Sequence, residues 1–355
     1  MYKVSKNNFD LIRLVLSLIV FITHAEFMTK HSFFHYVSNL FQMSSVLAVN
    51  SFFIVSGFLI FMSYENTKSI GIFLRKRFSR IYPGYSFVVL FVAVFAIFIS
   101  NSSLSDYLSS GFIPYLVSNL LTLNFLHSTL PGVFVNNAIH EVNGALWTIK
   151  IELMFYLSVP IIIYFIRKSN VIIVIFIVYI LSLIYHEYFT YYGLSENISL
   201  YLKLAKQLPG QLSFFVSGAL LYYYFDHFKK YRILYIIAAG LLFIYGCGYD
   251  WKLYKDSILW IFYPIALAFV VIYFATMFTY LGNFGRYGDF SFGVYIWHVP
   301  IIQTFIHFDI LSKYPIFGPI FLIMTVVAFS IVSWHFIEKP FLNKKSHYIK
   351  VEHND

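Results

Sequence analysis

Long hydrophobic runs, separated by short polar segments, cover almost the whole of this 355-residue sequence. Each run is about twenty residues long, the length that an α-helix needs to cross the hydrocarbon core of a bilayer. Because that core offers no water to the backbone, each run must be helical. The pattern therefore predicts an all-α, polytopic membrane helix bundle of about ten spans, at residues 9–29, 43–64, 83–101, 145–166, 170–189, 207–225, 233–249, 257–280, 290–308 and 315–336.

The composition supports a membrane domain that uses nearly the whole chain. Hydrophobic residues make up 59% and charged residues only 12%, against about 25% charged in a soluble domain. The net charge of +9 sits in short clusters between the runs, which indicates orientation signals and argues against a nucleic-acid partner. The single cysteine, Cys247, permits no internal disulfide and no cysteine-based metal site, and we expect no metal.

The distribution of lysine and arginine predicts the orientation of the chain. With ten spans and both termini in the cytosol, most cations fall in the inner loops, as the positive-inside rule requires. The segment 111–126 is apolar but broken by Pro114 and Asn119, and counting it as a crossing would put Arg167 and its neighbours outside. We therefore expect it to dip into the membrane or lie at the outer interface.

This topology predicts a single membrane domain over 1–341 and a short basic cytosolic tail over 342–355. The outer loop 102–144 is the longest loop and a natural place for an outer substrate. The first run follows Lys3 and Lys6 as in a signal peptide, but Arg13 lies within it, so we expect a retained first helix.

The first span contains two ionisable residues, Arg13 and His24, which are costly inside a membrane. They are eleven residues apart, so on a regular helix they share one face and are separated by about 16 Å along the axis. A snorkelling arginine and an interfacial histidine would also explain them. The shared face favours a common polar cavity. Asp10, one turn before Arg13, could pair with it, whereas Glu26 points away from His24.

Four cations precede the third span in FLRKRFSRIYP, residues 73–83. Arg77 and Arg80 are three residues apart and lie on one side of a helical turn, and Pro83 is expected to start the span. Orientation and attraction to anionic lipids would explain the cluster. A phosphate clamp would also explain it, because arginine forks match phosphate oxygens and coenzyme A is cytosolic.

Two further spans carry polar groups in the membrane. Glu152 lies at a depth similar to that of His24 and needs a partner or a function. It could form a structural pair, bind sugar hydroxyls, or orient a catalytic histidine. In the ninth span Ser291, Tyr295 and His298 follow one another at i, i+4 and i+7, which predicts one polar stripe along a cavity wall. A lone buried histidine is otherwise an ordinary hydrogen-bonding residue.

The segment SFFIVSGFLI at 51–60 is weakly repeated as SFFVSGALL at 213–221. Small residues at helix contacts explain both copies without a function. The sequence has no Walker loop, Rossmann fingerprint, His-Glu-x-x-His or GxSxG motif. The sequence therefore contains no motif that would indicate phosphoryl transfer, hydride transfer, zinc-dependent hydrolysis or serine hydrolysis.

Taken in order, the polar motifs resemble those of the acyltransferase-3 membrane proteins, which O-acylate bacterial surface polysaccharides and other acceptors. The matching pieces run from the first span to the end of the last span. They are FDLIRLVLSLIVFITHAE (9–26), NSFFIVSGFLI (50–60), RKRFSRIYP (75–83), LWTIKIELMFYLSVP (146–160), SFGVYIWHVP (291–300) and IEKPF (337–341). Each is loose alone, but the ordered set is specific. Thr148-Ile149-Lys150 departs from the Ser-Leu and apolar residue common in that family.

The resemblance implies roles for individual residues. His24 is the expected catalytic residue, with Glu152 as a second candidate. Arg13, Arg77 and Arg80 are expected to contact the acyl-CoA, with Arg13 lining the pore. Ser56 and Gly57 are expected along a narrow acyl path, and Ser291, Tyr295 and His298 along the substrate path.

The predicted function is transfer of an acyl group from cytosolic acyl-CoA to a hydroxyl of an extracytoplasmic carbohydrate, in a bacterial plasma membrane. Acetyl-CoA is the common donor in the family, and the acceptor could be lipid-linked. His24 could act as a general base or carry the acyl group covalently. A transporter or flippase for an anionic or sugar-linked substrate is the alternative. A membrane scaffold would not need so many polar groups inside the membrane.

Overall fold

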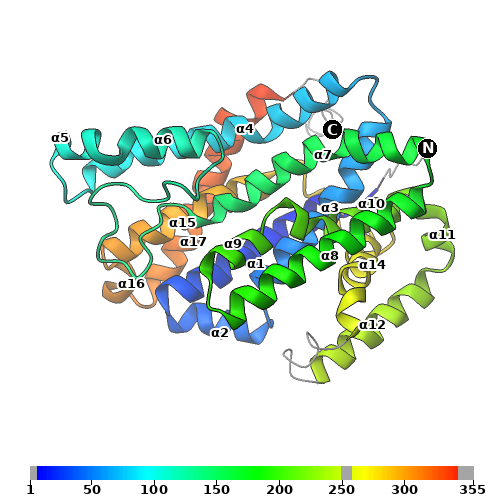
Figure 1. Ribbon diagram of the computed structural model, residues 1–355. Helices are drawn as coiled ribbons and strands as arrows, with labels where there is room; N and C mark the ends of the chain where they lie inside the picture. Colours follow the sequence, from blue (N-terminus) through cyan, green and yellow to red (C-terminus); the bar gives the residue numbers. More distant parts are fainter. Residues whose placement is uncertain (1–5, 249–257, 343–355) are drawn as a thin grey trace. The chain divides into compact units, whose positions relative to one another are not determined.

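The structure is a computed structural model that describes residues 6–248 and 258–342 (Figure 1). Over these residues every regular element is a helix, which confirms the all-α prediction. Among the described residues, ten longer helices overlap the ten predicted runs. They are α1 (Phe9–Thr29), α3 (Ser45–Glu65), α4 (Ile70–Phe95), α7 (Trp147–Lys168), α8 (Val171–Ser195), α10 (Leu208–Tyr223), α12 (Arg232–Gly248), α14 (Tyr263–Thr276), α15 (Phe290–His307) and α17 (Phe317–Val332).

Shorter elements connect these helices. The short α-helices are α2 (Ser32–Leu40), α5 (Leu104–Tyr107), α6 (Ile113–Leu120), α9 (Ser199–Ala205), α11 (Phe225–Lys230) and α16 (Ile310–Lys313). The 3-10 and π turns are η1 (Ala96–Phe98), η2 (Leu108–Phe112), η3 (Gly144–Leu146), η4 (Ile258–Phe262), η5 (Ser333–Glu338) and η6 (Lys339–Phe341). Most of the tail predicted over 342–355 lies outside the described residues.

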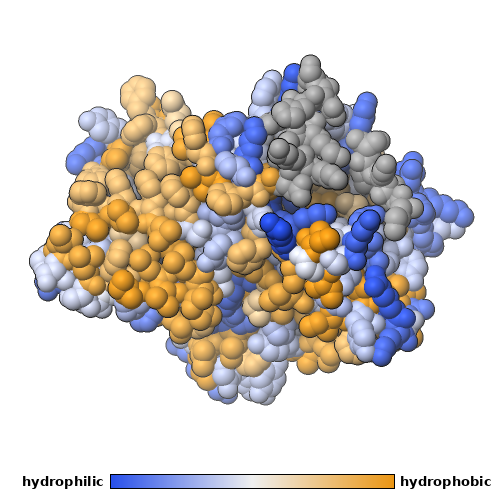
Figure 2. All heavy atoms as spheres, turned by 90° about the horizontal axis from the view of Figure 1, so that it is seen from above, coloured by the Kyte–Doolittle hydropathy of each residue, from blue (hydrophilic) through white to orange (hydrophobic). Residues whose placement is uncertain are grey.

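Within the described part of the chain, six helical segments are long and apolar enough to cross a membrane. They are Phe9–Thr29, Ser45–Glu65, Ile70–Phe98, Gly144–Lys168, Val171–Ser195 and Phe317–Phe341. Large hydrophobic side chains are exposed along these helices, and Figure 2 shows broad hydrophobic areas on one face of the molecule. A water-soluble protein rarely exposes such areas, so the chain is a membrane protein. The count of ten spans and the orientation stay predictions.

The chain divides into two compact units. The first comprises Met1–Ile12, Val49–Leu74 and Ile151–Gly282, and the second comprises Arg13–Ala48, Arg75–Lys150 and Asn283–Asp355. Each unit therefore combines segments that are far apart in the sequence.

In the first unit, the two copies of the repeated Ser-Gly motif pack against each other. A Cβ atom on Gly57 would lie 1.8 Å from the carbonyl oxygen of Phe215, and one on Gly218 would lie 2.0 Å from that of Ile54. Only glycine allows the two backbones to approach this closely. The packing of α3 against α10 thus accounts for both glycines, as the sequence suggested for small residues at helix contacts.

In the second unit, α15 is the central helix. It packs against α17 and η3, and most of its side chains are buried. A Cβ atom on Gly293 would lie 2.8 Å from Cα of Ser330 on α17, so these two helices are also in close contact. Gly288, just before α15, has φ of +130° and faces the Trp334 ring, a place that no other residue fits well.

The cationic segment before the third span is helical, which corrects the expected boundary. We expected a loop with Pro83 at the start of the span, but α4 begins at Ile70 and contains Pro83 in its interior. Proline removes one backbone hydrogen bond from a helix but does not always end it. Arg77 and Arg80 therefore project from a helix of 26 residues rather than from a loop.

The segment 111–126 does not form a long helix. It holds the end of η2, the eight-residue α6 and a turn, all too short to cross a bilayer. Tyr85 of α4 donates a hydrogen bond to the backbone carbonyl of Asn119 at 2.5 Å, which holds the end of α6. The rest of the predicted outer loop, up to η3, is irregular.

Candidate active site

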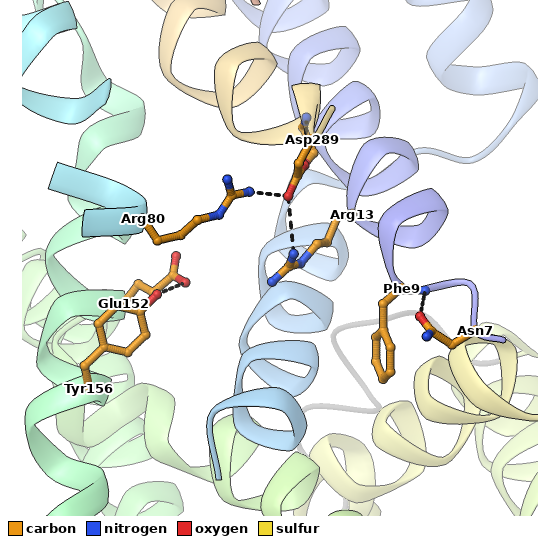
Figure 3. Close-up of polar contacts among 8 residues, drawn as sticks. Asn7, Phe9, Arg13, Arg80, Glu152, Tyr156 and Asp289 are labelled. Carbon is orange, nitrogen blue, oxygen red and sulfur yellow. Dashed lines mark hydrogen bonds and ion pairs between the residues drawn. The ribbon is translucent and has the colours of Figure 1, made fainter. Parts of the chain in front are cut away.

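The polar stripe of α15 begins with Asp289, the N-cap residue of the helix. Its carboxylate accepts hydrogen bonds from Ser291, from the backbone N–H at 3.2 Å and from the hydroxyl. It also forms ion pairs with Nη1 of Arg13 at 3.3 Å and with Nη2 of Arg80 (Figure 3). Asp289 is 4% exposed. We call these three charged residues the Asp289 node.

The Asp289 node explains why a carboxylate can lie buried here. An isolated buried carboxylate would be very costly, but two guanidinium groups and a helix N-terminus compensate for its charge. Arg80 also lies over the Trp334 ring, 5.3 Å from its centroid. The three side chains together carry a net charge of +1. Asp289 was not predicted as a site residue, although an aspartate directly before the polar stripe is the usual N-cap signal.

Further along the same two helices, His24 and His298 are in direct contact. Nδ1 of His24 lies 2.9 Å from Nε2 of His298, and the rings stack with their centroids 5.1 Å apart. His298 is 0% exposed, whereas His24 is only partly buried. Nδ1 of His298 lies 3.1 Å from the carbonyl oxygen of Val294. The sequence placed both histidines in polar surroundings but did not predict that they touch.

The middle of the stripe is tied to the start of α7. The hydroxyls of Tyr295 and Thr148 are 2.7 Å apart, and both residues are buried. The rings of Tyr295 and His298 have centroids 5.8 Å apart. Ser291, Tyr295 and His298 therefore each face a polar partner, namely Asp289, Thr148 and His24. The predicted stripe is a continuous row of buried polar contacts.

The irregular outer loop is fixed to α15 by amide side chains. Gln303, which is 0% exposed, donates to the carbonyl oxygens of Ile139 at 2.7 Å and Glu141 at 2.8 Å. Its side-chain oxygen accepts from Asn137 at 2.7 Å. Asn143 donates to the carbonyl of Ile296 at 2.9 Å. These bonds hold the segment from Asn137 to Asn143 against the helix that carries His298. Gln303 gave no signal in the sequence.

The cations of α4 divide into two pairs. Arg75 and Lys76 are exposed, whereas Arg77 and Arg80 are partly buried. The three-residue spacing of Arg77 and Arg80 puts them on one side of the helix, as the sequence predicted, and the structure shows that this side is partly buried. Arg80 forms an ion pair with Asp289. It is therefore not an exposed arginine that is available only to a phosphate group.

The remaining candidates lie in the first unit. Glu152 accepts a hydrogen bond from the hydroxyl of Tyr156, one turn further along α7, at 2.6 Å (Figure 3). Ser56 is buried in α3 beside the closely packed Gly57. Among the described residues, no group of three or more histidine, cysteine, aspartate or glutamate side chains could hold a metal ion.

The chain is a helical membrane protein with a buried polar row, and its sequence matches a known enzyme family. Residues 6–335 match the acyltransferase-3 family, described as an acyltransferase domain. The match covers nearly the whole chain. The chain belongs to this family and is a membrane acyltransferase.

Similar proteins agree with this assignment. The chain is 26% identical to an O-acetyl transferase of Shigella phage Sf6, over 96% of this chain and 97% of the phage protein. It is 24% identical to the O-acetyltransferase OatA of Staphylococcus aureus, over 84% of this chain and 53% of OatA. It is 30% identical to nodulation protein 10 of Rhizobium leguminosarum, over 44% of this chain and 43% of that protein. No solved structure matches the chain significantly.

Proposed function

We propose that this protein transfers an acetyl group from cytosolic acetyl-CoA to a hydroxyl of an extracytoplasmic carbohydrate in a bacterial plasma membrane. The observation that carries the proposal is the contact between the partly exposed residue His24 and the buried His298, whose Nδ1 and Nε2 atoms lie 2.9 Å apart. The O-acetyltransferase names of two similar proteins support the acetyl group. A cell-surface polysaccharide, lipid-linked or not, is the proposed acceptor.

His24 is the proposed catalytic residue. Acting as a general base, its Nε2 takes the proton of the acceptor hydroxyl while the oxygen attacks the thioester carbonyl. The C–O bond forms, the C–S bond breaks, and the departing thiolate takes up a proton. The products are an O-acetyl ester and free coenzyme A. A covalent acetyl-His24 intermediate would give the same products in two steps.

Arginines supply the donor contacts in this proposal. The Asp289 node keeps a net positive charge, and Arg77 adds another guanidinium on the same helix as Arg80. Guanidinium groups suit the phosphates of coenzyme A. Ser56 and Gly57 are the proposed acyl path. Glu152 is proposed to bind sugar hydroxyls.

The fixed outer loop is the proposed acceptor platform. Gln303 of α15 binds the carbonyl oxygen of Ile139 in the loop, and the Asn143 side chain of the loop donates to the Ile296 carbonyl of α15. The exposed residues of the loop include His127 and His140. A loop held against the helix that carries His298 can present an acceptor to the histidine end of that helix.

The test uses the full chain in membrane vesicles with acetyl-CoA labelled on the acetyl group. We expect label to appear as alkali-labile ester on envelope carbohydrate, and the His24→Gln variant to lose this transfer. His35→Gln is the matched control, because His35 is an exposed histidine that pairs with Glu26. Movement of a sugar-linked lipid without ester formation would contradict the proposal and favour a flippase.

A further inference from the structure

The two imidazole rings of the histidine pair differ in how their nitrogens are engaged. His298 uses both nitrogens, because Nδ1 lies 3.1 Å from the Val294 carbonyl oxygen and Nε2 lies 2.9 Å from Nδ1 of His24. His24 uses Nδ1 toward His298, and no hydrogen bond of its Nε2 to another described residue is seen, in a residue that is partly exposed as a whole. This asymmetry decides where each proton sits.

The proton assignment follows from the chemistry of the partners. A carbonyl oxygen can only accept, so Nδ1 of His298 carries a proton and donates to Val294. In a neutral imidazole the other nitrogen is then an acceptor, so Nε2 of His298 carries no proton. Nδ1 of His24 must therefore donate to it. The neutral His24 ring has its single proton on Nδ1 and its lone pair on Nε2.

We propose that His298 is a positioning residue that fixes the tautomer of His24, so that Nε2 of His24 faces the acceptor hydroxyl as an unprotonated base. The inference rests on the proposed role of His24 as a base and adds the group that prepares it. In serine proteases an aspartate holds the catalytic histidine in this way. Here the Val294 carbonyl and a neutral second imidazole replace it.

The proposal accounts for the proton throughout the step. When Nε2 of His24 takes the hydroxyl proton, the ring becomes an imidazolium with a proton on each nitrogen. The proton on Nδ1 of His24 remains on that atom and keeps its hydrogen bond to the neutral Nε2 of His298, which stabilises the new positive charge. The Nε2 proton then leaves with the coenzyme A thiolate, and both rings return to their starting tautomers.

Two substitutions of His298 separate a hydrogen-bonding role from a packing role. In His298→Gln, the side-chain oxygen can still accept from Nδ1 of His24, whereas His298→Leu offers no acceptor. We expect His298→Gln to keep at least about a tenth of the turnover and His298→Leu to fall about 100-fold or more. The loss should be in kcat, with the Kd for acetyl-CoA unchanged in both variants. Equal turnover of the two variants would overturn the proposal.

Parallel variants of His24 keep the two hypotheses apart. If His24→Gln were as active as the unmodified chain, the base assignment itself would fail. If His24→Gln were inactive but the two His298 variants were equal, only the tautomer proposal would fail.

A second measurement does not depend on the folding of any His298 variant. In the unmodified chain labelled with 15N-histidine and embedded in lipid, the signals lost on His24→Gln substitution belong to His24. We expect these signals to show a protonated Nδ1 and an unprotonated Nε2. The opposite tautomer would overturn the proposal.

Discussion

Helices α1 and α15 meet at two places that differ in chemistry. At one end Arg13 pairs with Asp289, and at the other His24 contacts His298. The first contact is charged, and Arg80 joins it from α4. The second is a pair of rings that need carry no charge, with one ring partly exposed. A charged cluster is suited to hold helices and anions, whereas a neutral pair of imidazole rings is suited to move a proton.

The same two contacts fix the direction of the helices. Arg13 precedes His24 by eleven residues, about 16 Å of helix, and Asp289 precedes His298 by nine, about 14 Å. The two helices therefore run parallel. Parallel helices in a membrane protein require an odd number of crossings between them. The predicted topology has seven, since spans two to eight lie between the first and ninth.

The largest expected effect is at the histidine end. His24→Gln should reduce transfer by about a thousandfold or more, because a general base contributes about 10²–10⁴. The Kd for acetyl-CoA should change less than about twofold, since the proposed donor contacts lie at the other end. Labelled-acetyl transfer and donor binding in the same vesicles would measure both. If donor binding fell together with transfer, the assignment of donor binding to the arginine end and of catalysis to the histidine end would be wrong.

The next effect is at the charged end. Asp289→Asn removes the charge that Arg13 and Arg80 share, and breaking a buried ion pair costs about 3–5 kcal/mol. Because both arginines are partly exposed, we expect a loss of about 2–3 kcal/mol in the free energy of unfolding. Thermal unfolding in detergent would show a lower midpoint. Asp226→Asn is the control, since Asp226 is exposed on α11. Unchanged stability of Asp289→Asn would mean that the node does not hold the helices.

A smaller effect should separate the cations of α4. We expect Arg77→Ala to raise the Kd for acetyl-CoA about tenfold, which corresponds to about 1.4 kcal/mol for one lost charged contact. Arg75→Ala should change it less than about twofold, because Arg75 is exposed on the other side of the helix. Binding isotherms of the two purified variants would decide. Equal effects would indicate that the cluster only orients the protein in the membrane.

The smallest effect concerns the acceptor loop. Gln303→Leu removes the amide that holds the carbonyls of Ile139 and Glu141, so the loop should become less ordered. We expect the KM for the acceptor to rise about three- to tenfold, with kcat and the Kd for acetyl-CoA within about twofold. Steady-state kinetics with varied acceptor would measure this. A fall in kcat at unchanged KM would mean that Gln303 acts on the histidine pair instead.

Much of this arrangement could be predicted from local sequence pattern. The shared face of Arg13 and His24 and the stripe from Ser291 to His298 follow from helix periodicity, and the structure has both. The partners could not be predicted, because contacts such as Arg13 with Asp289 join residues 276 positions apart. Asp10, one turn before Arg13, is the partner that sequence proximity offers, and the ion pair with Asp289 could not be predicted from local spacing.

Boundaries and single polar residues were harder to predict than faces. Pro83 suggested the start of a helix, but α4 already begins at Ile70 and continues past Pro83. Gln303 gave no signal because its hydrogen-bond partners are the carbonyl groups of Ile139 and Glu141, 164 and 162 positions away in the sequence. The positions of Glu152, Ser56 and Gly57 in the reaction stay predictions.

The two contacts differ in charge, so a membrane potential acts on them differently. A potential of 100 mV exerts about 2.3 kcal/mol on each elementary charge that crosses the full bilayer. Arg13, Arg80 and Asp289 together carry one positive charge, which a negative cell interior would draw toward the predicted cytosolic side. The resting histidine pair, with two neutral rings, carries no charge for the field to act on. The voltage would therefore anchor the arginine end of α1 and α15 and leave the resting proton position at the other end unchanged.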